Sequence, residues 1–413
     1  MKTDTIVLGA GIVGTSIALN LALEGRSVVL VDRRGPGEET SYGNAGLVER
    51  ASIYPVAFPR DIRALLDVAL GRNPAANYHW NALPGLAPWM FAYWRASAPD
   101  RILYYARTMQ KLLSRSLEEH ARLAKPSGAE HYFREGGWLK LYRSEAGIAN
   151  ERTEFPLAKQ YGLTAREISI DDALALEPAL RPVFTGAVLW SDPHSVSSPG
   201  GVTQAYAAHF LALGGRLLNG DARTLKKTAT GWKVTTTEGE IEAPEAVVAL
   251  GPWAMDVLAP LGLRLPLAVK RGYHMHYRGI GNATLSRPVL DEEGGYVITP
   301  MEGGIRLTTG VEFARRDAPK TPVQLDKTEV LARGLFPLGE RAEPEPWMGS
   351  RPAFPDMLPV IDRAPGQNGL WLAIGHQHLG FTLGPITGRL IAEMMSGKTP
   401  CTDPAPFSAK RFG

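Results

Sequence analysis

The chain has 413 residues, and its 45 Lys and Arg nearly balance its 42 Asp and Glu, leaving a formal net charge of +3. So small a charge, with no basic run, argues against a nucleic-acid partner, and the length suffices for two or three structural units with ample core. The single cysteine, Cys401, excludes an intrachain disulfide and a thiolate metal cluster, and we expect no metal.

No apolar run of eighteen residues occurs, and the N-terminus lacks the basic start, apolar core and cleavage site of a signal peptide. We therefore expect a cytoplasmic protein without an integral membrane segment. The slight positive charge is compatible with peripheral association on the inner face of the membrane.

The strongest motif lies in residues 5–32. A short apolar strand over 6–8 leads into Gly9, Gly11 and Gly14, spaced G-x-G-x-x-G, followed by an apolar helix, a second buried strand and then Asp32. The first glycine permits a tight turn, the second lets the backbone approach a pyrophosphate, and the third lets the helix pack on the strand. The helix N-terminus suits phosphate and the acid suits a ribose diol, so this stretch predicts dinucleotide binding without separating FAD from NAD.

The stretch after this unit reads as a turn at 33–37 and a loop of small and hydroxylated residues at 40–46. Such a loop suits close approach to a cofactor, although an ordinary polar loop has the same composition. Residues 57–125 are mainly helical in pattern, with a long helical period over 101–124. The aromatic residues at 80–94 could line a pocket, but packing between helices is favoured.

Further helices are expected over 199–213, 323–335 and 383–395, and further strands over 216–218, 232–236, 246–250, 271–277, 296–300, 305–311 and 370–374. The α/β segments stand at the start, middle and end of the chain, with antiparallel and helical segments between them. This order predicts an α/β fold, α+β overall, in which a discontinuous Rossmann-like nucleotide domain carries an inserted substrate domain built on an antiparallel sheet plus helices. We assign 1–56, 145–262 and 346–413 to the nucleotide domain, and 57–144 and 263–345 to the substrate domain.

Taken together, the motifs resemble the D-amino-acid oxidase superfamily of flavoproteins, and most closely its bacterial D-amino-acid dehydrogenases. The resemblance covers nearly the whole chain. Besides residues 9–32 and 40–46, it rests on Ala175-Leu-Glu-Pro178, Val247-Val-Ala-Leu-Gly251, Lys270-Arg-Gly-Tyr273, Gly349-Ser-Arg-Pro352 and Gly375-His-Gln-His-Leu-Gly380.

The resemblance implies FAD, bound non-covalently because Cys401 lies outside the motifs. It also implies that the final helix directs its positive end toward the flavin N1 and C2 carbonyl, although Thr382 could simply cap that helix. The family usually has a valine whose backbone contacts the adenine, and this sequence has Ala222 and Arg223 at that place, so this contact matches the family less well. The residues expected at the cofactor are Gly9, Gly11, Ile12, Val13, Gly14, Asp32, Arg33, Thr40, Ser41, Asn44, Ala45, Gly46, Leu47, Ala222, Arg223, Gly251, Leu379, Gly380, Phe381 and Thr382.

For the substrate, the resemblance identifies Arg351 as the arginine that binds the carboxylate, a role that the guanidinium fork suits. The resemblance also places Tyr273 where family members often have a polar pocket residue. Weaker candidates, for each of which a structural role is at least as favoured, are Tyr54, Tyr296, His378, His274 and His276. The implied reaction oxidises a D-amino acid, for example a cyclic one such as D-proline or a hydroxy-D-proline, to the imino acid and then the 2-oxo acid. Hydride passes from Cα to flavin N5, no protein base at carbon is required, and the electrons pass to a quinone or another acceptor.

Three alternatives stay open. The first is a secondary amine oxidase of the same fold that acts on sarcosine or glycine and uses oxygen. The second, an NAD-dependent dehydrogenase, is disfavoured because the motifs return to the cofactor at the C-terminus. The third is an accessory flavin subunit of a larger complex.

Overall fold

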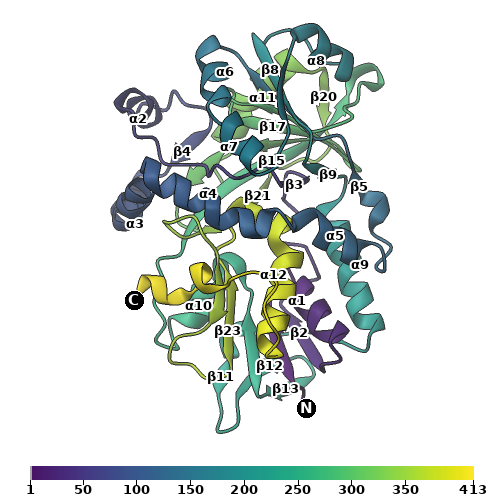
Figure 1. Ribbon diagram of the computed structural model, residues 1–413, viewed down its shortest axis with the longest axis vertical. Coiled ribbons are helices and arrows are strands. Elements are labelled where there is room, and N and C mark those ends of the chain that lie inside the picture. The colour runs from purple at the N-terminus through teal and green to yellow at the C-terminus, as the bar shows by residue number, and fades with distance from the viewer. Residues whose placement is uncertain (1) are drawn as a thin grey trace.

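The computed structural model describes residues 2–413, which form two sheet-based layers stacked along the long axis of the molecule (Figure 1). The first sheet has the order β10-β2-β1-β14-β23-β22. Its strands are β1 (Thr5–Leu8), β2 (Val28–Asp32), β10 (Arg216–Asn219), β14 (Glu245–Val248), β22 (Val360–Arg363) and β23 (Leu370–Ile374). All neighbours are parallel except β22 and β23. The runs of Val, Ile and Leu are buried because the sheet is covered on both faces.

Two helices that are far apart in sequence pack together on one face of this sheet, α1 (Ile12–Leu23) and α12 (Gly380–Met395). Small residues permit the close approach: a Cβ on Gly388 would lie 2.5 Å from the carbonyl oxygen of Ser16, and one on Gly384 would lie 2.9 Å from Ile12. The helix α9 (Pro199–Ala212) lies beside α1. The opposite face carries a small antiparallel sheet of β11 (Lys226–Lys227), β12 (Trp232–Thr236) and β13 (Gly239–Ala243), and the short helix α10 (Ala254–Leu258).

The second layer is an eleven-stranded, mainly antiparallel sheet with the order β4-β19-β15-β18-β17-β16-β6-β8-β7, in which β20 and β21 also pair with β15. Its long central strand is β15 (Ala268–Gly279), and the helix α11 (Val323–Leu335) packs on it. The other strands are β4 (Ala76–Tyr78), β6 (Trp138–Tyr142), β7 (Ala165–Ile168), β8 (Gly186–Trp190), β16 (Val289–Asp291), β17 (Tyr296–Met301), β18 (Gly304–Thr309), β19 (Val311–Phe313), β20 (Leu338–Arg341) and β21 (Trp347–Ala353).

The remaining elements connect or flank the two layers. A three-stranded sheet of β3 (Leu47–Val48), β9 (His194–Val196) and β5 (Phe133–Arg134) joins them. The other helices are α2 (Ile62–Ala69), α3 (Leu83–Ala96), α4 (Pro99–Leu113), α5 (Ser116–Ala124), α6 (Glu145–Arg152), α7 (Phe155–Gln160) and α8 (Ile170–Leu176), and a 3₁₀ turn, η1 (Trp80–Ala82), precedes α3. The single helix expected over 101–124 is wrong: the chain breaks at Ser114 and Arg115 into α4 and α5, and the Ser116 hydroxyl donates to the carbonyl of Leu113 at 2.8 Å.

The predicted fold class is confirmed, a Rossmann-like α/β unit beside a unit with an antiparallel sheet and helices. The domain boundaries stay a proposal. Strands β7, β8 and β21 come from segments that we assigned to the nucleotide domain, yet they pair in the larger sheet.

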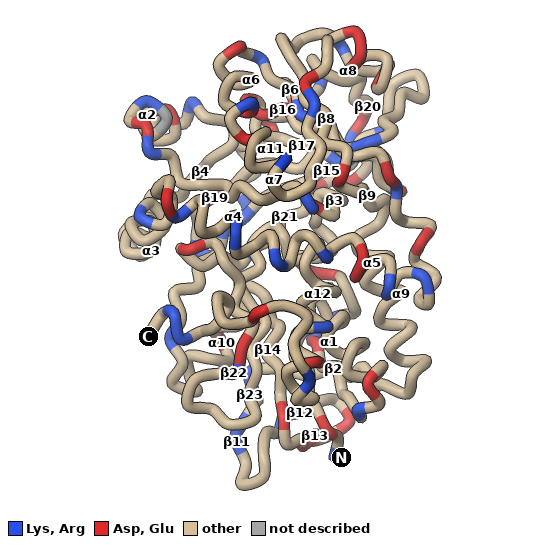
Figure 2. The backbone as a smooth tube through the Cα atoms, viewed as in Figure 1, with Lys and Arg blue, Asp and Glu red and all other residues tan. Residues whose placement is uncertain are grey.

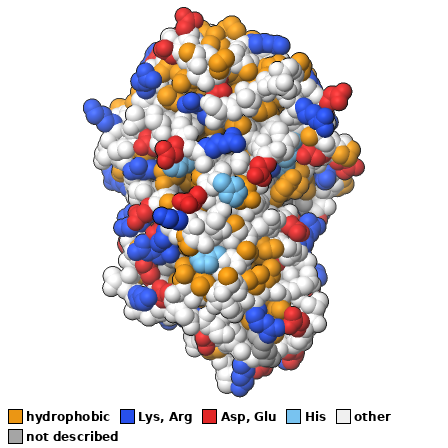
Figure 3. Space-filling model, turned by 90° about the vertical axis from the view of Figure 1, so that its right-hand side faces the viewer, with side chains coloured by type: hydrophobic (Ala, Val, Ile, Leu, Met, Phe, Trp, Pro, Cys, Tyr) orange, Lys and Arg blue, Asp and Glu red, His pale blue; other side chains and the backbone are white. Residues whose placement is uncertain are grey.

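Charged side chains of both signs are dispersed along the backbone (Figure 2). The face in Figure 3 likewise intersperses basic, acidic and hydrophobic side chains rather than presenting one large field of a single sign. Within residues 2–413, none of the helices has the length and apolar character needed to cross a bilayer.

Candidate active site

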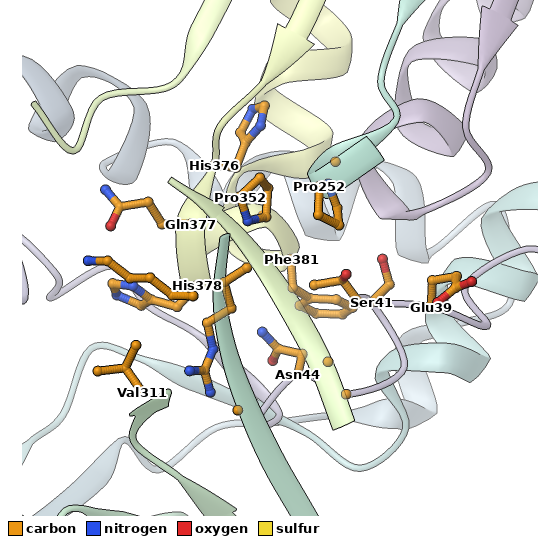
Figure 4. A pocket seen from close by; sticks show the side chains of 18 of the residues that line it. Glu39, Ser41, Asn44, Pro252, Val311, Pro352, His376, Gln377, His378 and Phe381 are labelled. Carbon is orange, nitrogen blue, oxygen red and sulfur yellow. The ribbon is translucent and has the colours of Figure 1, made fainter. Parts of the chain in front are cut away.

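A cavity of about 1310 Å³ lies between the two layers and is lined by residues from both. One end is formed by the glycine motif and the start of α1, and the other by β15, β18 and the 3₁₀ turn before α12. In Figure 4, Glu39 and Ser41 lie toward one side of the pocket and Gln377, His378 and Val311 toward the other, with Asn44 and Phe381 between them. The cavity is therefore elongated and chemically different at its two ends.

The glycine motif forms a tight turn that a larger residue would block. Gly9 has a φ of +104°, and a Cβ at that position would lie 2.5 Å from the carbonyl oxygen of Ala249, while a Cβ on Gly14 would overlap the carbonyl oxygen of Gly9. Gly11 is less crowded, since the Ser41 hydroxyl at 3.3 Å is its near neighbour. The turn thus leaves the backbone of Gly9 and Gly11 open to the cavity, as a pyrophosphate site requires.

Asp32 supports this turn directly. Its Oδ2 accepts a hydrogen bond of 2.6 Å from the backbone N–H of Ala10, and its Oδ1 accepts one of 2.9 Å from that of Arg34. The carboxylate also lines the cavity, so it faces the position expected for a ribose while it holds the motif in place. Nearby, the Arg33 guanidinium lies 4.3 Å from the ring centroid of Trp253, and both residues line the same end.

The loop over residues 40–47 is fixed from both layers. The Ser41 hydroxyl accepts from the N–H of Ile12 at 2.9 Å, and the Thr40 hydroxyl donates to the carbonyl of Ser350 at 2.9 Å. Arg306 on β18 donates from Nη1 to the carbonyls of Tyr42, at 2.8 Å, and Asn44, at 2.6 Å. These bonds hold the loop along the middle of the cavity. We therefore favour the interpretation that the loop contacts the cofactor over the alternative of an ordinary polar loop.

The final helix begins at Gly380, three residues earlier than the sequence pattern indicates. Thr382 therefore lies inside the helix and does not cap it: its Oγ1 accepts a 3.0 Å hydrogen bond from the N–H of Glu49, just after the cofactor loop. Gly380 and Phe381 line the cavity, so the first turn of α12 faces it with the positive end of the helix dipole.

Arg351 lies at the far end of the cavity on β21. Its Nη1 donates to the carbonyl of Gly310 at 2.8 Å and its Nη2 to that of Thr309 at 3.2 Å. The guanidinium crosses β15 above Gly272, where a Cβ would lie 2.7 Å from both terminal nitrogens. Desolvation lowers the pKa of Arg351 to about 10, so it remains cationic at neutral pH. Among residues 2–413, no carboxylate forms an ion pair with it.

Lys270 is the register partner of Arg351 across β15 and β21, and the sequence analysis did not single it out as a site residue. Its side chain is 8% exposed and lines the cavity, with Nζ 3.9 Å from the ring centroid of Tyr93. Burial, assisted by the charge of Arg351, lowers the pKa of Lys270 to about 7. Desolvation and the same two cations lower the pKa of His378 to about 3, so its imidazole is neutral. The positive charge at this end of the cavity therefore favours binding of an anion.

Most of the other residues predicted at the site also line the cavity. Those that do are Ile12, Val13, Asn44, Ala45, Leu47, Ala222, Arg223, Gly251, Tyr54, Tyr273 and Tyr296, whereas Gly14, Gly46, Leu379 and Thr382 lie behind the lining. The space beside Gly46 is taken by Met301, whose Cε would lie 2.5 Å from an added Cβ. Arg223 also forms an exposed ion pair with Asp221 at 2.7 Å.

Three of the substrate-site candidates serve internal contacts. The Tyr273 hydroxyl donates to Glu312 at 2.9 Å and accepts from Arg271 at 2.9 Å, within a buried network. His274 stacks on Trp347 with ring centroids 4.8 Å apart, and His276 bonds to Glu343 through Nδ1 at 2.6 Å. Neither histidine lines the cavity.

Four ionisable residues on another part of the cavity wall are not among the residues predicted from the sequence. They are Glu49, Lys140, Glu154 and Glu292. Burial raises the pKa of Glu49 to about 7 and that of Glu154 to about 7, and it also raises the pKa of Glu292. These residues come from separate segments, so no local motif joins them. Lys270, by contrast, stands in the Lys-Arg-Gly-Tyr motif, which could have identified it.

Comparisons with known proteins agree with this arrangement. The chain is 31% identical to a D-amino-acid oxidase of Bradyrhizobium diazoefficiens, over 98% of each chain, and 28% identical to a D-amino acid dehydrogenase of Chromohalobacter salexigens, over 99% of each. A glycine oxidase from Geobacillus kaustophilus has the same fold, with a TM-score of 0.76, 22% identity and 98% of each chain covered. Residues 4–394 match the family described as DAO, FAD dependent oxidoreductase, and the chain belongs to that family of flavoenzymes that oxidise amino acids.

Proposed function

We propose that this protein oxidises a D-amino acid at Cα and passes the electrons to a quinone or another acceptor. Bound FAD supplies the hydride acceptor, N5 of the flavin, and the residues of the chain bind and orient the substrate. The observation that carries the proposal is the cationic end of the cavity: Arg351, held by two backbone carbonyls, stands beside the buried Lys270 in the cavity that the glycine motif also lines.

In this proposal the substrate binds with its carboxylate toward Arg351. A fork of N–H donors fixed by the carbonyls of Thr309 and Gly310 restricts the rotation of that carboxylate, so Cα–H adopts one direction relative to the cofactor loop. The amine must be neutral when hydride leaves Cα, because its lone pair then becomes part of the C=N bond. The neutral His378 adds no positive charge that would oppose the cationic imine.

The D-configuration is proposed from the relatives, whose names include D-amino acid dehydrogenases and a D-amino-acid oxidase. The experiment is anaerobic bleaching of the flavin by D- and L-amino acids, added singly, with glycine and sarcosine included. We expect bleaching by D-isomers, and we expect Arg351→Ala to lower kcat/KM by about 100-fold or more. Bleaching only by sarcosine or glycine would place the protein with the glycine oxidases, and no bleaching by any amine would refute the proposal.

For the acceptor, we propose a quinone in the membrane, reached by peripheral association of the region around α2. Leu65 and Val68 of this helix line the cavity, whereas other apolar side chains of α2 and its neighbours are exposed, namely Ile62, Leu66, Leu70, Trp80 and Phe91. Contacts connect them: Trp80 packs on Tyr78, whose hydroxyl donates to the carbonyl of Ala69 at 2.6 Å. Exposed Arg60, Arg63 and Arg72 flank the set and suit anionic headgroups.

Co-sedimentation with anionic and zwitterionic vesicles tests this acceptor proposal. We expect binding to anionic vesicles that is lost in an Ile62→Asp, Leu66→Asp variant, together with reduction of a ubiquinone analogue. A Leu211→Asp variant, which changes an exposed leucine on α9, serves as the matched control. Equal sedimentation of all three proteins, or rapid reoxidation by oxygen alone, would argue against a membrane quinone.

A further inference from the structure

The cavity has an anionic wall in addition to its cationic end. Glu49, Glu154 and Glu292 line it around Lys140. Lys140 forms an ion pair with a fourth acid, Glu151, in which its Nζ lies 3.0 Å from Oε1. Glu151 also accepts a hydrogen bond of 2.7 Å from Nε1 of Trp190. Among residues 2–413, none of the three lining glutamates forms an ion pair with a cation of its own. The wall therefore carries more carboxylates than it has cations to balance them.

The pKa values of the three glutamates indicate that their negative charges are not fully balanced by nearby cations. Burial disfavours the charged forms of Glu49 and Glu154 and raises the pKa of each to about 7, against the opposing field of Lys140. The Ser52 hydroxyl donates a hydrogen bond to Oε2 of Glu49 but brings no positive charge to it. Glu292 is exposed, but it lines the cavity, and desolvation raises its pKa as well. Such carboxylates would be stabilised by a cation that enters the cavity. No group of three or more potential ligands in the described residues is arranged to hold a metal ion.

An independent observation comes from the other end of the cavity. Lys270 is more than nine-tenths buried and lines the cavity, and among residues 2–413 neither a hydrogen bond nor an ion pair satisfies its Nζ, which lies over the rings of Trp89 and Tyr93. With Arg351 beside it, this end requires an anion just as the wall requires a cation. The two requirements point to one ligand that carries both charges.

Strand register gives the separation of the two charged regions. Arg351 bonds to the carbonyl of Thr309 on β18, Thr309 pairs with Tyr296 on β17, and Tyr296 pairs with Asp291 on β16. Glu292 directly follows Asp291. Two strand spacings of about 4.8 Å separate the anion site from Glu292 by roughly 10 Å. A side chain with a stem of three or four methylene groups can bridge this distance from an α-carboxylate, whereas a proline ring is too short.

We infer that the anionic wall of Glu49, Glu154 and Glu292 receives a cationic side chain, so that the enzyme prefers D-amino acids with a terminal ammonium or guanidinium. This inference rests on the proposed function and specifies its substrate class. The substrate spans the cavity, with its α-carboxylate at Arg351 and Lys270 and its terminal cation at the wall. Charge, rather than length alone, then selects the substrate.

The test compares D-arginine with D-citrulline, which has nearly the same shape but no charge, and D-lysine with D-norleucine. We expect kcat/KM for each charged substrate to exceed that of its neutral counterpart by about 30-fold or more, and both to exceed that of D-proline. In Glu154→Gln, Glu292→Gln we expect the D-arginine to D-citrulline ratio to fall by about tenfold or more. Glu302→Gln, at an exposed position outside the cavity, should keep the wild-type ratio.

A binding readout separates this inference from the catalytic proposal. The des-amino analogue 5-guanidinopentanoate has no α-amine to oxidise, and we expect it to perturb the flavin spectrum at lower concentration than hexanoate does. If the guanidino acid binds preferentially but no amino acid bleaches the flavin, the wall is supported and the proposed oxidation fails. If neutral D-amino acids or D-proline bleach the flavin as efficiently as D-arginine does, the oxidation is supported and the inference about the wall is overturned.

Discussion

The guanidinium of Arg351 lies on the backbone of Gly272, close enough that a methyl group at position 272 would stand 2.7 Å from both Nη1 and Nη2. The two residues are diagonal neighbours on adjacent strands, because Gly272 pairs with Gly349 and Lys270 pairs with Arg351 across β15 and β21. A glycine in the middle of a long buried strand weakens the sheet, and here it creates the space through which the arginine reaches Thr309 and Gly310.

We therefore predict that Gly272→Ala impairs substrate binding while the fold and the flavin site survive. The added methyl would push the guanidinium away from its carbonyl anchors, so KM should rise by about tenfold or more. Steady-state kinetics with the best D-amino acid, alongside the flavin spectrum, measures this. Gly334→Ala is the matched control, since Gly334 lies in the exposed part of α11 with open space around it and should keep the wild-type KM. An unchanged KM in Gly272→Ala would contradict the role assigned to Arg351.

The sequence predicted the nucleotide-binding half well because its signals are local. In residues 5–32 the turn, the helix and the acid follow one another directly, and each glycine answers a steric requirement that can be stated without a structure. Arg351 was identified only through the resemblance, since nothing within Gly349-Ser-Arg-Pro352 shows that its partners are the carbonyls at 309 and 310.

The anionic wall could not be predicted in the same way. Glu49 follows the cofactor loop, Lys140 lies on β6, Glu154 precedes α7 and Glu292 follows β16, so only the tertiary fold brings them to one surface. Tyr273 shows the same dependence on the fold: its place in a motif suggested a substrate contact, and it lines the cavity, but its hydroxyl is bonded to the buried pair of Arg271 and Glu312. Long-range pairing decides which polar side chains remain available to a ligand.

The glycine motif yields a second prediction from the contrast between Gly14 and Gly11. A methyl group on Gly14 would overlap the carbonyl oxygen of Gly9, so Gly14→Ala should distort the turn and lower the melting temperature even without FAD. Gly11 has only the Ser41 hydroxyl near its Cβ position, at 3.3 Å, so Gly11→Ala should keep the melting temperature of the apoprotein but weaken FAD binding. Thermal unfolding of apo and reconstituted proteins checks both outcomes. Equal effects of the two variants would show that crowding at Gly14 does not govern the turn.

A third prediction concerns the attachment of FAD. Cys401 is a free, half-buried thiol beside the C-terminal end of α12, where its N–H donates to Glu393 at 2.6 Å, and it does not line the cavity. Burial, with the nearby carboxylate of Glu393, raises the pKa of the Cys401 thiol to about 12, so it is not a reactive thiolate. We expect acid precipitation to release all the flavin and the intact mass to equal that of the polypeptide. Cys401→Ser should bind FAD as the wild type does, and a mass increase equal to that of FAD would contradict the expectation.

The buried Lys270 predicts how anion binding depends on pH. Its pKa is lowered to about 7 by burial and by Arg351, and a bound carboxylate would favour its protonated form. Affinity for propionate should therefore be full below pH 7 and fall with rising pH above it, approaching tenfold per pH unit until the pKa of the complex is reached. The effect on stability has the opposite sign: between pH 7 and about 10.4 the unfolded chain holds the extra proton, so this lysine makes the folded state more stable as pH rises.

Flavin difference spectra with propionate from pH 6 to 9 measure the slope, and Lys270→Met should flatten it. Glu49 also titrates near pH 7 and its charge would repel an anion, so Glu49→Gln distinguishes the two groups. If Lys270 is responsible, Glu49→Gln retains most of the slope, because the lysine stands beside the carboxylate-binding arginine whereas the charged neighbour of Glu49 is Lys140. A flat profile in the wild type, or one abolished only by Glu49→Gln, would mean that Lys270 does not contact the bound anion.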